Sequence, residues 1–241
     1  MLTLYQFPIS HYCEKVRWAL EYKSIEYKKV NLLPGLHAKK AKKLSSKYTL
    51  PILQHGDSVI SESSKIISYL DKTFPDTLLT PTDCELLSQS KQWESFADKE
   101  LGADVRSLCY HTLLDHPDLI TPFFTKGGPW YGKLYMKLSY PKLSQTMRKL
   151  MKLDDAAIIT IKERLTQNIE KAHAHINERE FFVGNCFSRA DLAMASLLAP
   201  LSKAKNYGID WPEQYPEPLQ SSIDEFGNKL DWTHRIYSQH R

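Results

Sequence analysis

The chain has 241 residues, of which 42% are hydrophobic and 25% charged, and its net charge at pH 7 is +4. This composition predicts one or two packed domains that can bury a core, and the small charge gives no sign of nucleic-acid binding. No apolar run approaches the roughly 18 residues that span a bilayer, so membrane insertion is not expected. Met1 is followed at once by a strand-like segment rather than by a signal sequence, which predicts a cytoplasmic protein.

The cysteines show no paired spacing along the chain; they are Cys13, Cys84, Cys109 and Cys186. Scattered cysteines favour free thiols in a reducing compartment over a disulfide framework or a zinc site. His173 and His175 would point from different faces of a helix, so no metal centre is predicted.

Hydrophobic residues in the first part of the chain switch between a period of two, typical of strands, and a helical period. In chain order the predicted elements are a strand over 2–7, a helix around 13–20, a strand over 25–32, a short lysine-rich helix over 37–47, a hairpin over 51–60 that turns at Gly56-Asp57, and a helix over 63–74. The order βαβαββα predicts an α/β domain over residues 1–75.

Beyond a turn-rich linker at about 75–82, the periodic segments are all helical. Apolar stripes at helical spacing run from Trp93 to Leu108 and from Ile158 to Ile176. An all-α helical bundle is therefore predicted over residues 82–241.

A basic, aromatic-rich segment without acids occupies residues 119–153, between the two stripes, and is broken at Gly127-Gly128 and at Tyr140-Pro141. A plain helical extension is the favoured interpretation, because mixed Lys and Leu at helical spacing is typical of a half-buried helix. Folding over an active site and contact with an anionic surface are the alternatives.

The segment Phe187-Ser-Arg-Ala-Asp-Leu192 has the residue pattern of a helix start. Ser188 is expected at the N-cap, and Asp191 at the third helical position, where it can reach back to the N-cap amide. The apolar helix that follows is expected at the centre of the bundle.

Ser10 is expected between the end of the first strand and the start of the first helix. The unpaired amides and the dipole of a helix start favour an anion such as a thiolate, and a hydroxyl that donates to the sulfur would stabilise its charged form further. A simple capping role for Ser10 is the alternative.

Three motifs resemble those of glutathione transferases: Ser10-His-Tyr-Cys13, where related proteins carry a Cys-Pro-Tyr/Phe-Cys or Cys-Pro-Phe-Ala site, Thr49-Leu-Pro51 and Glu62-Ser63. The resemblance implies a thioredoxin-like domain followed by an all-helical domain, of a bacterial-type or omega/zeta-like member with Ser at the active-site position. Glutathione is then the co-substrate.

The resemblance also implies how the tripeptide is held. Leu50 offers its backbone to the cysteinyl part before a cis Pro51, Ser63 binds the γ-glutamyl carboxylate, and Glu62 binds the ammonium group. His37 binds the glycine carboxylate, with Lys40 as the alternative. Tyr5 and Tyr12 compete with Ser10 for the role of activating hydroxyl.

The acceptor site is expected between the domains, as a region that consists of Tyr12, Trp93, Phe96, Tyr110 and His111, with Trp130 or Tyr131 as further candidates. The resemblance implies a homodimeric detoxification enzyme that transfers glutathione to an apolar electrophile or reduces a hydroperoxide. Its alternatives are a thiol transferase or reductase that works through Cys13 and a non-catalytic protein of the same fold that binds a ligand or a partner.

Overall fold

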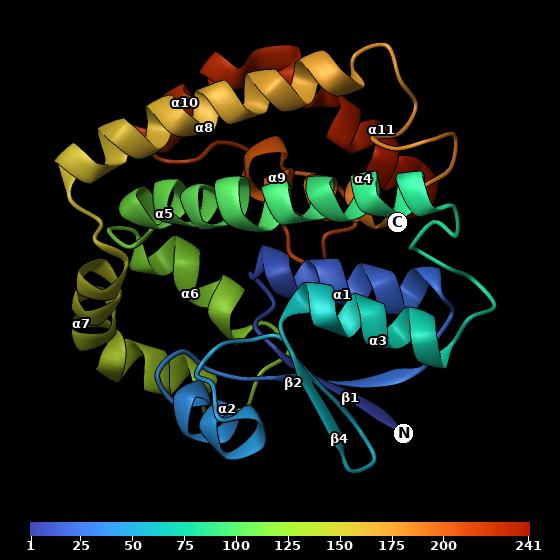
Figure 1. The fold of residues 1–241 in the computed structure, drawn as a ribbon. Helices are drawn as coiled ribbons and strands as arrows, with labels where there is room; N and C mark the ends of the chain where they lie inside the picture. Colours follow the sequence, from blue (N-terminus) through green and yellow to red (C-terminus); the bar gives the residue numbers. More distant parts are fainter.

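The computed structural model describes all residues from Met1 to Arg241 and begins with a four-stranded sheet (Figure 1). The strands, in the spatial order β2-β1-β3-β4, are β2 (Tyr27–Asn31), β1 (Leu2–Gln6), β3 (Ile52–His55) and β4 (Ser58–Ser61). β2 runs parallel to β1, and β3 is antiparallel to both β1 and β4. Leu4 lies opposite Leu53 in the register of the two central strands.

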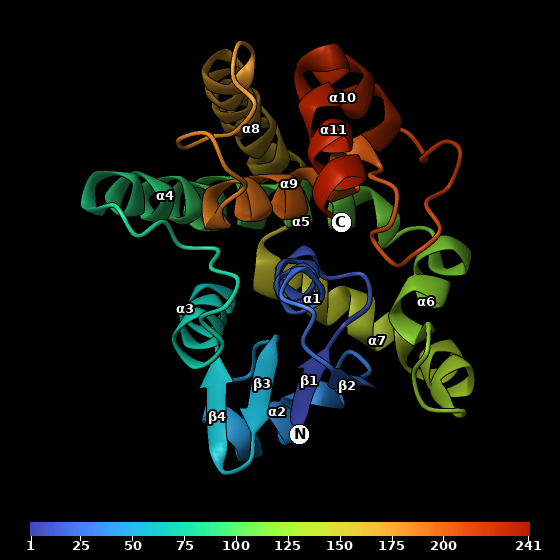
Figure 2. The ribbon, with the colours of Figure 1, turned by 90° about the vertical axis from the view of Figure 1, so that its right-hand side faces the viewer.

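Helices cover both faces of this sheet, and they are α1 (His11–Tyr22), α2 (His37–Ser45) and α3 (Ser63–Thr73). Leu4 and Leu53 belong to the main core together with α1 and α3, whereas Tyr5 and Ile52 pack with Ala41 of α2 on the other face. In Figure 2, α1 and α3 lie above the strands and α2 lies behind them. The predicted order βαβαββα is confirmed.

No helix or strand is formed between residues 74 and 83, where the linker was predicted. The segment is nevertheless anchored, because Leu79 is only 1% exposed and its amide donates to the Asp71 carboxylate at 3.1 Å. The Leu79 carbonyl in turn accepts from the Arg189 amide at 2.7 Å. The linker is therefore held against both halves of the chain.

The rest of the chain is helical, as predicted, and comprises α4 (Cys84–Phe96), a π-helical turn η1 (Ala97–Leu101), α5 (Gly102–Leu113), α6 (Pro117–Thr125), α7 (Gly132–Met151), α8 (Asp155–Ile176), α9 (Arg189–Ser202), α10 (Leu219–Phe226), a 3₁₀ turn η2 (Gly227–Leu230) and α11 (Asp231–His240). The helix α9 is buried on nearly all sides, between α1 below it and α8 and α11 above it (Figure 2). None of the helices combines the length and the apolar character needed to cross a bilayer.

The capping box that begins α9 is confirmed. The Ser188 hydroxyl accepts from the backbone at the start of the helix, and the Asp191 carboxylate accepts from the Ser188 amide at 2.9 Å. Asp191 also accepts from the Phe182 amide at 2.6 Å and is fully buried. One carboxylate therefore joins the helix start to the loop that precedes it.

The basic segment 119–153 forms helices, as favoured from the sequence, but the break predicted at Pro141 is wrong. The helix α7 continues through Pro141, and the Tyr140 side chain anchors it by donating to the Leu114 carbonyl at 2.9 Å. Near its start, the Tyr135 hydroxyl donates to the Pro34 carbonyl at 2.9 Å. The segment therefore reaches from the helical part to the loop before α2.

Candidate active site

Two adjoining pockets lie where the sheet and its helices meet the helical part. The polar pocket has a volume of about 620 Å³ and only two hydrophobic residues in its lining. The apolar pocket has a volume of about 540 Å³, and 17 of its 26 lining residues are hydrophobic. Tyr12, Thr49, Leu50 and Arg106 line both pockets. A molecule bound along these four residues can therefore have a polar end in one pocket and a reactive group beside the other.

Ser10 lines the apolar pocket and precedes α1. Its backbone is extended, and its Oγ accepts from the Cys13 amide at 3.3 Å, so it is the N-cap that the sequence allowed for. A hydroxyl oxygen can accept through one lone pair while its hydrogen donates elsewhere. The capping role is therefore compatible with donation to an anion at the positive end of α1.

The loop that carries Ser10 is held by buried donors behind it. The Arg17 guanidinium donates to the Pro8 carbonyl at 3.2 Å. The Tyr207 hydroxyl donates to the Ile9 carbonyl at 2.6 Å. Because the two carbonyls just before Ser10 are fixed, one by Arg17 of α1 and the other by Tyr207, which is 198 residues from Ile9 in the sequence, the serine is rigidly positioned.

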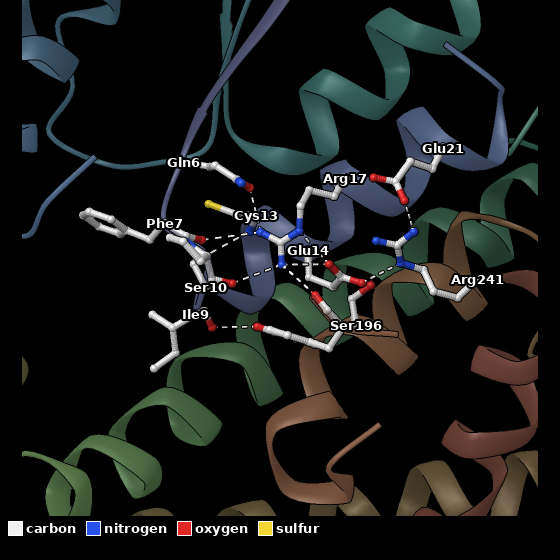
Figure 3. A network of polar contacts seen from close by, with 12 residues as sticks. Gln6, Phe7, Ile9, Ser10, Cys13, Glu14, Arg17, Glu21, Ser196 and Arg241 are labelled. Atoms are coloured by element: carbon white, nitrogen blue, oxygen red, sulfur yellow. Dashed lines mark hydrogen bonds and ion pairs between the residues drawn. The ribbon is translucent and has the colours of Figure 1, made fainter. Parts of the chain in front are cut away.

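The charge of Arg17 is balanced inside the same network, which Figure 3 shows from close by. Glu14 is fully buried and pairs with Arg17 at 2.7 Å on one side and with Arg241 at 2.8 Å on the other. No sequence pattern predicts this network, because Glu14 and Arg241 are 227 residues apart along the chain.

The hydroxyl groups of Tyr5 and Tyr12 are both occupied. Tyr5 donates to the Gln54 side chain at 3.1 Å and lines neither pocket. Tyr12 donates to the backbone carbonyl of Asp98 at 2.8 Å, and burial, together with the Asp98 charge, raises its pKa to about 12. Of the three hydroxyls considered from the sequence, Ser10 is the one that both faces a pocket and keeps its hydrogen available.

Cys13 is a poor nucleophile in this structure. Its side chain is fully buried, and burial raises the pKa of its thiol. Cys109, which lines the apolar pocket, is 6% exposed, and burial raises its pKa to about 12. Since the thiolate is the reactive form, neither group is suited to disulfide exchange.

Alkylation of the native protein with iodoacetamide at pH 8 is expected to modify Cys84 and Cys186, which are exposed, while Cys13 and Cys109 stay unmodified. Mass spectrometry after limited reaction measures the modified positions. In denaturant all four should react. Fast modification of Cys13 in the native state would contradict the buried, protonated thiol and would favour a mechanism through that residue.

Polar groups for one end of a tripeptide meet in the polar pocket. Glu62 and Ser63 both line it at the start of α3, and Ser63 is 5% exposed with no hydrogen bond from its hydroxyl to the protein. Glu62 has a φ of 75°, which is strained for a residue other than glycine, and its carboxylate pairs with Lys65 at 2.9 Å and with Lys47. Such strain is common at binding sites.

The backbone at Leu50 faces both pockets, and the Leu50–Pro51 peptide bond is cis, as the resemblance implies. His37 lines the apolar pocket at the first position of α2, with its ring 4.7 Å from that of Phe7. Burial lowers the pKa of His37, and its Nδ1 has no hydrogen-bond partner. Lys40 lines neither pocket; its ammonium group lies over the Tyr5 ring.

The residues expected at the acceptor site are divided by the structure. Tyr12 and Tyr110 line the apolar pocket, whereas Trp93, Phe96 and His111 line neither pocket. Trp93 and Phe96 pack on each other, and Trp93 also contacts Phe182 in the helical core. His111 pairs with Asp155 at 3.0 Å at the surface. A helical stripe shows which side of a helix is buried, but not which neighbour buries it.

The rest of the apolar pocket comes from residues that the sequence did not single out. Trp130 is 93% exposed, and neither it nor Tyr131 reaches the pocket. The later part of α7 lines it instead, through Leu143, Thr146, Met147, Leu150 and Met151. The segment 119–153 therefore forms a wall of this pocket, which agrees with the alternative that it folds over a site. Within the whole chain, no cluster of three or more His, Cys, Asp or Glu could hold a metal ion.

Comparison with known proteins gives consistent sequence matches. A family model described as "Glutathione S-transferase, N-terminal domain" matches residues 4–78. "Glutathione S-transferase 1" of Dianthus caryophyllus is 40% identical over 87 residues, which are 35% of this chain and 39% of that protein. "Glutathione S-transferase TCHQD" of Arabidopsis thaliana is 24% identical over 233 residues, 89% of this chain and 80% of that protein. The match at higher identity thus spans less than two fifths of the relative's own length.

Solved structures resemble the whole chain. Glutathione transferase F7 from Populus trichocarpa has a TM-score of 0.66 and 18% identity, covering 99% of this chain and 94% of that one. Beta-etherase LigF from Sphingobium sp. strain SYK-6 has a TM-score of 0.65 and 17% identity, covering 99% of both chains. At these identities the structures show the fold alone, a thioredoxin-like domain followed by helices. Together, the sequence matches show that residues 4–78 resemble the N-terminal domain of glutathione S-transferases, and the solved structures show that the whole chain shares its fold with proteins of that kind.

Proposed function

We propose that this protein is a glutathione transferase, in which residues 1–75 bind glutathione and residues 82–241 supply most of the acceptor site. The observation that carries the proposal is the position of Ser10. It caps α1 beside the apolar pocket, close along the chain to Tyr12, which borders both pockets. A thiol placed there would meet a hydroxyl donor and the positive end of a helix, which both favour its ionised form.

Glutathione would lie along the shared lining of the two pockets. Its γ-glutamyl end would occupy the polar pocket, where the Ser63 hydroxyl and the first amides of α3 bind the carboxylate and Glu62 binds the ammonium group. Its cysteinyl part would pair with the Leu50 backbone. Its glycine carboxylate would accept a hydrogen bond from His37 at the start of α2.

The reaction of the bound thiolate with the acceptor requires mainly that the two molecules are held close together. The thiolate would attack an electrophile held in the apolar pocket, or the peroxide oxygen of a hydroperoxide, at the high effective concentration that a bound pair provides. The apolar lining selects hydrophobic acceptors. The resemblance to glutathione S-transferases further supports a cytoplasmic homodimer with a role in detoxification.

Isothermal calorimetry with glutathione tests this function. The wild-type protein is expected to bind glutathione saturably at millimolar concentration, and Ser63→Ala should weaken binding by about tenfold or more, since a hydrogen bond to a charged group contributes about 1.5–3 kcal/mol. Ser58→Ala is the matched control, because Ser58 is exposed on β4 and lines neither pocket. Equal affinities in all three proteins would contradict the assigned position of the γ-glutamyl group.

A further inference from the structure

Arg106 holds an unusual position between the two pockets. It lies on α5 and is one of the four residues that line both. The lining of the apolar pocket contains no Asp, Glu or Lys, and Arg106 is the single Arg among its residues. Since a guanidinium remains charged in proteins, this pocket contains one permanent positive charge and no acid.

The guanidinium of Arg106 has no partner in the protein. It makes no hydrogen bond or ion pair, and its Nε is buried and unsatisfied. Two arginines that are buried as whole residues differ sharply from the partly buried Arg106 in this respect. Arg17 pairs with Glu14 at 2.7 Å, and Arg189 pairs with Glu94 at 2.5 Å. A buried donor without a partner costs free energy, so an arginine left in this state suits an anion that is bound from outside.

The groups around Arg106 cannot supply that anion. His11 also lines the apolar pocket, and its pKa is lowered to about 3 by burial and by the Arg106 charge, so its ring is neutral. The hydroxyl of Tyr12 is used by the Asp98 carbonyl. Burial also raises the pKa of Tyr110, which keeps its hydroxyl protonated.

The acids of the neighbouring polar pocket already have basic partners. Asp98 pairs with Lys15 at 2.8 Å, and Glu94 pairs with Lys15 and Arg189 at 2.9 and 2.5 Å. Glu62 pairs with Lys47 and Lys65. The free cation therefore faces the pockets without competition from a protein carboxylate.

We infer that the acceptor substrate is an apolar electrophile that carries a carboxylate, and that Arg106 binds this carboxylate through its free nitrogen donors. The inference rests on the proposed function, since it names the class of acceptor for that reaction. The two carboxylates of glutathione would have their partners at Ser63 and His37, which leaves Arg106 to the second substrate. Arginine binds carboxylates through two parallel hydrogen bonds, so it also fixes the orientation of the acceptor.

For an α,β-unsaturated ketone that bears a carboxylate, the reaction balances without a further reagent. The glutathione thiolate forms a carbon–sulfur bond with the β-carbon, and the electron pair of the double bond moves to the carbonyl to give an enolate. The proton released from the thiol to solvent is replaced by a solvent proton that adds to the α-carbon. Arg106 exchanges no proton or electron and acts only as a binding and positioning residue.

The test compares ethacrynic acid with its methyl ester, which share the same unsaturated ketone and differ in the charged group. For the wild-type protein kcat/KM for the acid should exceed that for the ester. Arg106→Gln should lower the acid-to-ester ratio by about 10- to 100-fold, with little change for the ester, as expected for the loss of a charge-assisted hydrogen bond. Arg106→Lys should restore part of the ratio, and because Arg106 has no protein partner, neither variant should unfold at a lower temperature.

Three results would overturn the inference. The wild-type protein could prefer the ester, or Arg106→Gln could leave the ratio unchanged. Thirdly, the variant could slow both substrates equally and raise the pKa of the bound glutathione thiol, which would show that Arg106 stabilises the thiolate instead. In the last two cases the proposed transferase function would stand.

A binding experiment separates the inference from the proposed function. Calorimetry measures the affinity of the acid for the protein loaded with S-methylglutathione, which cannot react, and also for the protein alone. Binding of the acid that is lost in Arg106→Gln supports the carboxylate site even if turnover is absent. If the protein conjugates the ester but binds no detectable acid, the carboxylate site at Arg106 is rejected, while the proposed transferase function stands.

Discussion

Replacement of Ser10 by Ala is expected to lower kcat for conjugation of glutathione by about 100- to 1000-fold, the loss that accompanies removal of one positioned donor to a developing or stabilised anion. Affinity for glutathione should change little, because the groups expected to bind its two ends remain. Stopped-flow or steady-state kinetics with a saturating acceptor measure the effect. A large loss of kcat is expected because Ser10 is rigidly positioned. The two carbonyls that precede it accept hydrogen bonds from Arg17 and Tyr207.

Two further variants separate catalysis from folding at this position. Ser10→Ala also removes the N-cap of α1, which costs about 1 kcal/mol of stability, so thermal unfolding must be measured alongside activity. Ser10→Thr keeps a hydroxyl and should recover much of the rate. Cys13→Ser should stay active, because the Cys13 thiol is buried and protonated. A fully active Ser10→Ala together with an inactive Cys13→Ser would reverse the assignment.

The largest expected effect on stability is that of Asp191→Ala, at about 3 kcal/mol of the free energy of unfolding, because several buried donors lose their acceptor at once. The Asp191 carboxylate accepts from the amides of Phe182 and Ser188 at 2.6 and 2.9 Å and from the Ser188 hydroxyl at 2.9 Å. Phe182, Ser188 and Asp191 are all buried, so water cannot replace the carboxylate. Urea unfolding followed by circular dichroism measures the change.

Asp154, at the start of another helix in the helical part of the chain, offers a matched control for Asp191. It is the N-cap of α8 and accepts from the Ala157 amide at 2.9 Å, but it is exposed. Asp154→Ala should therefore cost only about 1 kcal/mol, because water can replace the lost acceptor. Equal losses for the two variants would show that the Asp191 box acts only as a local cap and does not hold the centre of the bundle together.

Local sequence patterns predicted the elements of this fold well, for a physical reason. Hydrophobic period, turn residues and the Ser188–Asp191 box act within a few residues, so they can be read without knowledge of the tertiary structure. Pro141 was read wrongly because a proline was assumed to end a helix. In the structure, α7 continues through it and is fixed to the rest of the protein by Tyr135 and Tyr140.

Candidate site residues could be predicted from the sequence where a single short segment contains all the residues of a recognisable motif. Ser10 became a candidate because a polar side chain stands at a helix start, and Glu62 and Ser63 became candidates because their segment resembles a motif of glutathione transferases. Arg106 was missed, since on the sequence it is one more basic residue of a helix. Its significance depends on the absence of a partner, which only the three-dimensional arrangement reveals.

The pKa of the thiol of bound glutathione tests the central claim most directly. Titration of the thiolate absorbance in the presence of saturating protein should give a pKa about one to two units below that of free glutathione for the wild-type protein. In Ser10→Ala the pKa should return most of the way to the free value. An unshifted pKa in the wild-type protein, or no saturable binding of glutathione at millimolar concentration, would contradict the account.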